Sequence, residues 1–211
     1  MPQSSTPTAP REGLTIYTVG HSNHDEEAFL NLLREHRIGV IVDTRTSPYS
    51  KYTPHFSKEN LESSLESSGV RYLFLGNELG GRPRSAAYYD EDGYVLYERL
   101  AKSKPFRAGI AKVLDEAGRN RVALVCGEED PSSCHRRLLV GRVLVEEGVT
   151  LLHIRGDGSL EYEEDLRRVE AEVKEARKHG QQSLFDLEEE PEWKSIRSVS
   201  PRRPPESFSG S

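Results

Sequence analysis

Short apolar runs alternate with helix-like segments along most of the chain. Five runs have the composition of buried strands, and they cover residues 14–19, 38–42, 70–74, 121–126 and 149–154. Between them, apolar residues recur at helical spacing around residues 29–33 and over 58–67, 105–117 and 135–147. Buried strands that alternate with such helices are typical of a parallel sheet with helices on both faces. The pattern predicts an α/β fold, a three-layer Rossmann-like domain over residues 14–156 with a mostly parallel sheet of about five strands.

The two ends of the chain lack this alternation. Residues 1–13 are rich in Pro, Ser and Thr with little to bury, which predicts a disordered leader. Residues 157–180 are highly charged, and their apolar positions follow helical spacing from Leu160 to a stop at Gly180, which predicts an amphipathic helix. Residues 181–211 are acidic and rich in Ser and Pro, which predicts a disordered tail.

Composition and charge narrow the functional classes. No run approaches the roughly 20 apolar residues of a membrane helix, and the first residues lack the apolar stretch of a signal peptide, so we expect a cytoplasmic protein without membrane contact. The only cysteines are Cys126 and Cys134, which rules out a disulfide scaffold. The net charge of −6 argues against a broad nucleic-acid-binding surface. Because the acidic excess lies mainly after residue 155, a local anion site within the domain stays open.

Polar residues gather where the predicted strands end. Ligands of parallel α/β sheets bind beyond the carboxyl ends of the strands, so these residues are expected to share one site. Each also has a simple structural explanation as a turn, a helix cap, an ion pair or a core filler. The candidates, in chain order, are His21, Ser22, Asp43, Arg45, Ser47, Glu78, Gly80, Gly81, Cys126, Glu128, Cys134, His135 and Arg136.

Together these motifs resemble the prokaryotic domain-of-unknown-function family 488. The resemblance rests on GHS at 20–22, D-x-R-x-x-P at 43–48, the stretch 72–81, and C-x-E followed by CHR within 126–136. It covers about residues 14–155 and includes all the candidates above except Ser47. It supports the fold more than the function, because the family has no firmly established reaction.

Three kinds of chemistry fit the candidate residues. We favour hydrolysis of a phosphate-containing or nucleic-acid substrate, with Asp43 or Glu128 as base or nucleophile and His21 as proton shuttle. Arg45 and Arg136 would hold the phosphate, while Cys126 completes the catalytic set and the other candidates contact the substrate. A non-catalytic module that binds a nucleotide or DNA is the first alternative.

A thiol enzyme of rhodanese or phosphatase type is the second alternative. Such enzymes need an arginine shortly after the cysteine, but Arg136 is ten residues from Cys126. Acidic residues in between would repel an anion and raise the thiol pKa. A divalent metal is chemically allowed by the Cys, His and acidic residues, although the spacing C-x7-C-H matches no familiar zinc pattern, so the cofactor stays unassigned.

One short motif lies in the acidic tail. Gln181, Ser183, Leu184 and Phe185, within QQSLF, resemble the bacterial sliding-clamp-binding peptide. In that peptide the Leu and Phe fill an apolar pocket and the Gln hydrogen-bonds at its rim. Alternatively, the apolar residues fold back on the domain. Tethering to a ring that encircles DNA would compensate for the weak basic character of the protein, which predicts a role in DNA repair or replication-linked processing.

Overall fold

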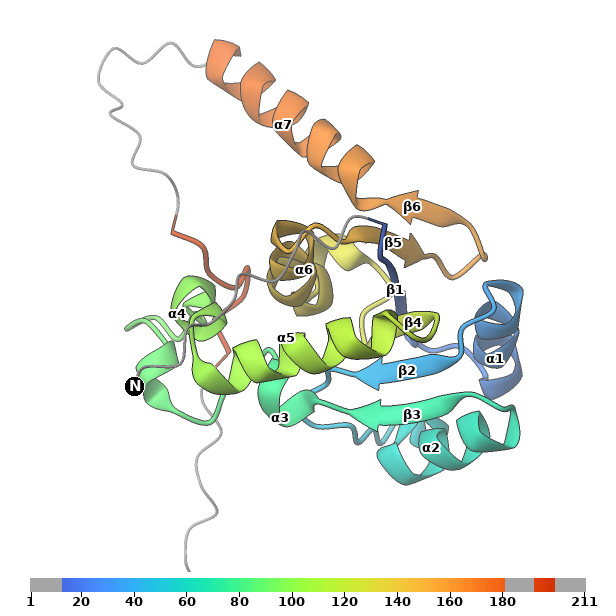
Figure 1. Cartoon of the computed structure of the whole chain (residues 1–211). Helices are drawn as coiled ribbons and strands as arrows, with labels where there is room; N and C mark the ends of the chain where they lie inside the picture. Colours follow the sequence, from blue (N-terminus) through green and yellow to red (C-terminus); the bar gives the residue numbers. More distant parts are fainter. Residues whose placement is uncertain (1–12, 181–191, 200–211) are drawn as a thin grey trace, which may run out of the picture.

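The computed structural model describes residues 13–180 and 192–199. Within these residues the core is a six-stranded sheet with the order β3-β2-β4-β1-β5-β6 (Figure 1). All neighbouring strands are parallel except β6, which is antiparallel to β5. The strands are β1 (Thr15–Gly20), β2 (Val40–Asp43), β3 (Arg71–Phe74), β4 (Val122–Cys126), β5 (Thr150–Ile154) and β6 (Leu160–Tyr162). The predicted α/β class with a mostly parallel sheet is confirmed.

Helices cover both faces of the sheet (Figure 1). They are α1 (Glu26–Glu35), α2 (Lys58–Ser67), α3 (Gly76–Leu79), α4 (Tyr97–Ala101), α5 (Lys104–Ala117), α6 (Arg142–Glu146) and α7 (Glu163–Gly180). Short turns of 3-10 helix cover Pro54–Phe56 (η1), Ala86–Tyr88 (η2) and Pro131–Ser133 (η3), and a π-helical turn over Arg136–Gly141 (η4) leads into α6.

The alternation of side chains along each strand divides the core into two clusters. On β4, Leu124 packs into the cluster built with α5 and α6, whereas Val125 packs into the cluster built with α1 and α2. Such strands are apolar on both faces, as expected for the middle of a parallel sheet. The strand ends are therefore held from both sides, which fixes the positions of the residues that follow them.

The segment after β5 differs from the prediction. Residues from Leu160 were predicted to be helical, but Leu160–Tyr162 form the edge strand β6, and α7 begins only at Glu163. A turn after Arg155 causes the difference, because Asp157 accepts a hydrogen bond from the Ser159 backbone amide and the chain folds back along β5. None of the helices in the described ranges is long and apolar enough to cross a membrane.

Residues 192–199, which we call the C-terminal strap, lie against the domain instead of forming part of a disordered tail. The Ser195 amide donates to the Val95 carbonyl (2.9 Å), and the Val95 amide donates to Ser195 Oγ (2.9 Å). The Trp193 indole donates to the Leu138 carbonyl (2.9 Å), and Lys194 pairs with Asp90 (3.0 Å). The predicted leader and the clamp-like motif at 181–187 lie outside the described residues, apart from Gly13 at the end of the leader.

Candidate functional site

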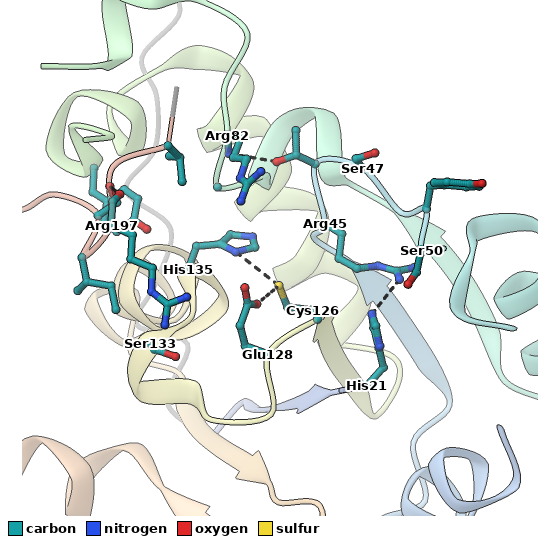
Figure 2. A pocket seen from close by; sticks show the side chains of 18 residues that line it. His21, Arg45, Ser47, Ser50, Arg82, Cys126, Glu128, Ser133, His135 and Arg197 are labelled. Carbon is teal, nitrogen blue, oxygen red and sulfur yellow. Dashed lines mark hydrogen bonds between the residues drawn. The ribbon is translucent and has the colours of Figure 1, made fainter. Parts of the chain in front are cut away.

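A cleft of about 350 Å³ opens at the carboxyl ends of β1, β2 and β4 (Figure 2). The strap and the loops after these strands form its walls. Of the residues predicted from the sequence, the cleft brings together His21, Arg45, Ser47, Gly81, Cys126, Glu128 and His135. Six others do not line it, namely Ser22, Asp43, Glu78, Gly80, Cys134 and Arg136.

Two thiols, a carboxylate and an imidazole meet at and just beneath the floor of the cleft. We call Cys126, Glu128, Cys134 and His135 the Cys–His–Glu cluster. The thiols of Cys126 and Cys134 donate to Glu128 Oε2 at 3.0 and 3.2 Å. His135 Nδ1 lies 3.6 Å from the sulfur of Cys126 and 4.0 Å from that of Cys134. Cys126 and Glu128 were predicted to be catalytic, and Cys134 and His135 were predicted to contact the substrate.

The orientation of the His135 ring follows from one hydrogen bond. Its Nε2 lies 3.0 Å from the Thr44 carbonyl oxygen, which can only accept, so Nε2 carries a proton. The other ring nitrogen, Nδ1, therefore faces the two sulfur atoms. Gly81 permits this placement, because a Cβ there would lie 2.7 Å from the His135 ring.

The loop after β4 folds the cluster together. Cys126 ends the strand, and Asp130 caps the following 3-10 turn by accepting from the Ser132 amide (2.8 Å). Cys134 then precedes the next helix: its carbonyl accepts from the first helical turn, and its sulfur lies 3.5 Å from the Arg136 backbone amide. A strand end and a helix start, both rigid, thus carry the two thiols.

The two thiols differ in their acidity. The hydrogen bond with Cys134 and burial both raise the pKa of Cys126 well above its usual value. Burial also opposes ionisation of Cys134, but hydrogen bonds with Cys126 and His135 outweigh it and lower the pKa of Cys134 to about 5. The same interaction with Cys134 outweighs burial at His135 and raises its pKa. Cys134 is thus the thiol that loses its proton more readily, yet it is only 1% exposed.

Glu128 is the carboxylate of this cluster that faces the cleft. Burial opposes its ionisation, but hydrogen bonds from both thiols outweigh that effect and lower its pKa to about 2. It is therefore ionised throughout the neutral pH range.

Asp43 and Arg45 form a buried ion pair beneath the cleft. Arg45 donates to both carboxylate oxygens of Asp43 (2.9 Å from Nε and 2.6 Å from Nη2), and Tyr72 donates to Oδ2 (2.7 Å). The third donor of Arg45, Nη1, reaches the Phe56 carbonyl (2.7 Å). Asp43 has no exposed surface and its oxygens are already hydrogen-bonded, so the pair fixes the loop after β2 and Asp43 is not placed to act as a base.

His21 and Arg136 also hold structure in place. His21 Nδ1 lies 3.0 Å from the Ser22 carbonyl and Nε2 lies 3.1 Å from Arg45, so both ring nitrogens are engaged. Burial, with the nearby Arg45, lowers the pKa of His21 to about 4. Arg136 is fully buried, and its guanidinium donates to the carbonyls of Glu128 and Glu129. Arg136 therefore holds the loop of the cluster and lies outside the cleft.

The remaining predicted residues lie around the cleft. Ser22 follows β1 with a φ of 45° and donates to Asn23. Glu78 and Gly80 line a neighbouring hollow, where Glu78 pairs with Lys112 (2.9 Å).

Two further arginines line the cleft. Arg82 and Arg197 line the cleft on either side of His135, and both are exposed (Figure 2). Neither has a carboxylate partner among the described residues. The Gly80-Gly81 motif was a local signal for Arg82, but nothing in the sequence could mark Arg197, because it reaches the cleft only through the strap.

The parallel sheet and the cleft beyond its strand ends define a Rossmann-like α/β protein with a thiol-containing site at the position where this class binds ligands. Residues 25–143 match the domain of unknown function DUF488, and the chain belongs to this family. The family resemblance seen in the sequence is thereby confirmed. No curated protein matches the chain.

Proposed function

We propose that this protein is a hydrolase that acts on a phosphate-bearing substrate, a nucleotide or a nucleic acid, in the cleft. The observation that carries the proposal is the pair of exposed arginines, Arg82 and Arg197. They lack carboxylate partners among the described residues and line the same cleft as an ionised Glu128. Guanidinium groups bind phosphate oxygens in a bidentate manner. Phosphoryl-transfer catalysis consists mainly of positioning and electrostatic stabilisation, and these two arginines supply both.

Glu128 has the position of a group that orients a water. Its carboxylate faces the cleft, and its Oε2 is fixed by the thiol of Cys126, which keeps its proton. A fixed, ionised carboxylate accepts a hydrogen bond from a water and directs the lone pair of that water toward the phosphorus. Asp43 and Arg136, which the sequence suggested for catalysis, act in this proposal as positioning residues.

Turnover and binding measurements on matched variants test the reaction. Purified full-length protein is incubated with nucleoside triphosphates and with short single-stranded and duplex oligonucleotides, and products are separated by chromatography. Glu128→Gln should lower kcat by about 100-fold or more while substrate still binds. Arg82→Ala and Arg197→Ala should weaken binding, whereas Arg84→Ala, an exposed arginine outside this cleft, should not.

The other outcomes separate the alternatives. Binding that depends on Arg82 without product from any substrate would identify a non-catalytic nucleotide or DNA-binding module. Turnover unaffected by Glu128→Gln, with a covalent adduct on Cys126 or Cys134, would identify thiol catalysis. The burial of Cys134 argues against this cysteine as the nucleophile of a thiol enzyme, because a nucleophile must reach its substrate.

We further propose that the motif at 181–187 recruits the enzyme to a bacterial sliding clamp, and hence to DNA repair or replication-linked processing in the cytoplasm. The support is the Gln, Leu and Phe pattern in the sequence. A fluorescent peptide of residues 178–190 should bind purified clamp, and Leu184→Ala with Phe185→Ala should abolish binding. Gln182→Ala, at the variable position of the motif, is the matched control. A double variant that binds like the unchanged peptide would refute recruitment through this motif.

A further inference from the structure

Three potential metal-ligand atoms meet just beneath the floor of the cleft. The ligand atoms of Cys126, Cys134 and His135 all lie within 4.8 Å of one another. Oε2 of Glu128 lies beside them, 3.0 and 3.2 Å from the two sulfurs. We propose that Cys126, Cys134 and His135 bind one zinc ion and that the fourth position of the coordination sphere is open on the side of the cleft.

The spacing of these atoms matches a tetrahedral zinc site. With Zn–S bonds of about 2.3 Å and Zn–N bonds of about 2.05 Å, a tetrahedron has S···N edges of about 3.6 Å. The observed S···N distances are 3.6 Å for Cys126 and 4.0 Å for Cys134. Zinc can therefore bind with small side-chain adjustments.

The surroundings of His135 are those of a metal-binding histidine. A ligating imidazole usually donates its second ring N–H to a carbonyl or carboxylate, which fixes the ring and the tautomer. His135 does so through Nε2 and the Thr44 carbonyl, and this leaves Nδ1 directed at both sulfurs. The hydrogen bond thus prepares the ring for a ligand on its Nδ1 side.

The donor set selects zinc over the common hard cations. Thiolate sulfur and imidazole nitrogen favour zinc, whereas magnesium and calcium prefer oxygen ligands. Cys126 and Cys134 are 5% and 1% exposed, so bulk water competes little for these positions. Three protein ligands with a fourth position open to a cleft is the arrangement of catalytic zinc sites, in which the metal acidifies a bound water.

Metal analysis tests the site without any substrate, so its outcome is independent of the proposed hydrolase. Full-length protein is reduced, freed of metal, reconstituted with zinc and desalted, and zinc is measured by mass spectrometry. We expect one zinc per chain. Cobalt in its place should give thiolate-to-metal charge transfer and strong tetrahedral visible absorption. Cys126→Ser, Cys134→Ser and His135→Gln should each remove this signal, and His21→Gln, the other histidine of the cleft, should keep it.

A second measurement protects the test against variants that do not fold. In the unsubstituted protein, zinc should shield both cysteines from a thiol-reactive disulfide reagent, and a chelator should restore their reactivity. Glu128→Gln should retain the metal, because the carboxylate lies outside the proposed ligand set. The zinc site is refuted if reconstituted protein holds no stoichiometric metal, or if the thiols react equally with and without zinc.

Discussion

Gly20 allows the loop of the Cys–His–Glu cluster to pass close to the end of β1. A Cβ at this position would lie 1.9 Å from the Glu128 carbonyl oxygen, 2.6 Å from the Glu128 carbonyl carbon and 2.7 Å from Glu129 Cα. All three atoms are backbone, so no side-chain rotation can relieve the contact. Gly20→Ala must therefore push the loop and the strand end apart by about 1.5 Å to restore ordinary van der Waals contact.

The cost of Gly20→Ala follows from what holds the loop. Overpacking at a buried position costs about 1–3 kcal/mol. Displacement of the loop also weakens the two hydrogen bonds from the buried Arg136 to the carbonyls of Glu128 and Glu129, and a hydrogen bond to a charged group is worth about 1.5–3 kcal/mol. We expect a loss of about 3–5 kcal/mol in the free energy of unfolding, measured by urea denaturation.

Gly39, which immediately precedes β2, provides the matched control. A Cβ there would meet only the Arg121 carbonyl oxygen at 3.9 Å. Gly39→Ala should therefore change the free energy of unfolding by less than about 1 kcal/mol. A slight increase is also expected, because alanine lowers the conformational entropy of the unfolded chain. Equal effects of the two substitutions, or a loss below about 1 kcal/mol for Gly20→Ala, would show that the loop yields freely and refute the reasoning.

Three further outcomes are expected. Burial opposes ionisation of Glu163, but hydrogen bonds from His153 and Arg137 outweigh it and lower the pKa of Glu163 from 4.5 to about 2. The ionised carboxylate therefore stabilises the fold above about pH 5, and this stabilisation is lost as the pH falls toward 2. Glu163→Gln should remove about 2 kcal/mol of the stability difference between pH 7 and pH 3 in urea titrations. Asp43→Asn, which breaks the buried ion pair with Arg45, should lower the free energy of unfolding by about 3–5 kcal/mol in urea denaturation. The control Asp115→Asn, in the exposed ion pair with Arg119, should lower it by less than about 0.5 kcal/mol. Ser195→Ala should speed amide hydrogen exchange at Val95 about 10-fold, without changing exchange in β4.

The sheet was predictable because burial and secondary structure reinforce each other there. The runs that became β2 and β4 are apolar on both faces, which only a central strand explains. The short strand β6 has no such signal, since two of its three residues are exposed and its pairing follows from the turn before it. The position of the C-terminal strap could not be predicted from the sequence either, because polar contacts such as those of Ser195 with Val95 hold it in place.

The location of the site was predictable, but the roles of its charged residues were not. Parallel strands bring their carboxyl ends to one edge, so His21, Arg45 and Cys126 had to lie near one another. Whether a buried charge is free or engaged depends on partners that are remote in sequence. Asp43, for example, accepts a hydrogen bond from Tyr72 on the neighbouring strand, and nothing in the local sequence indicates that contact.

The long spacing between Cys126 and Cys134 in the sequence did not indicate that their side chains lie close together. Familiar zinc motifs place two ligands on one tight turn, so two to four residues separate them. Here seven residues separate Cys126 from Cys134, but Arg136 binds the carbonyls of this loop and Asp130 caps its 3-10 turn. The anchored loop brings the two sulfurs within 4.8 Å of each other. The positions that define the cluster therefore include Gly20 and Arg136, which touch the loop from outside and contribute no ligand of their own.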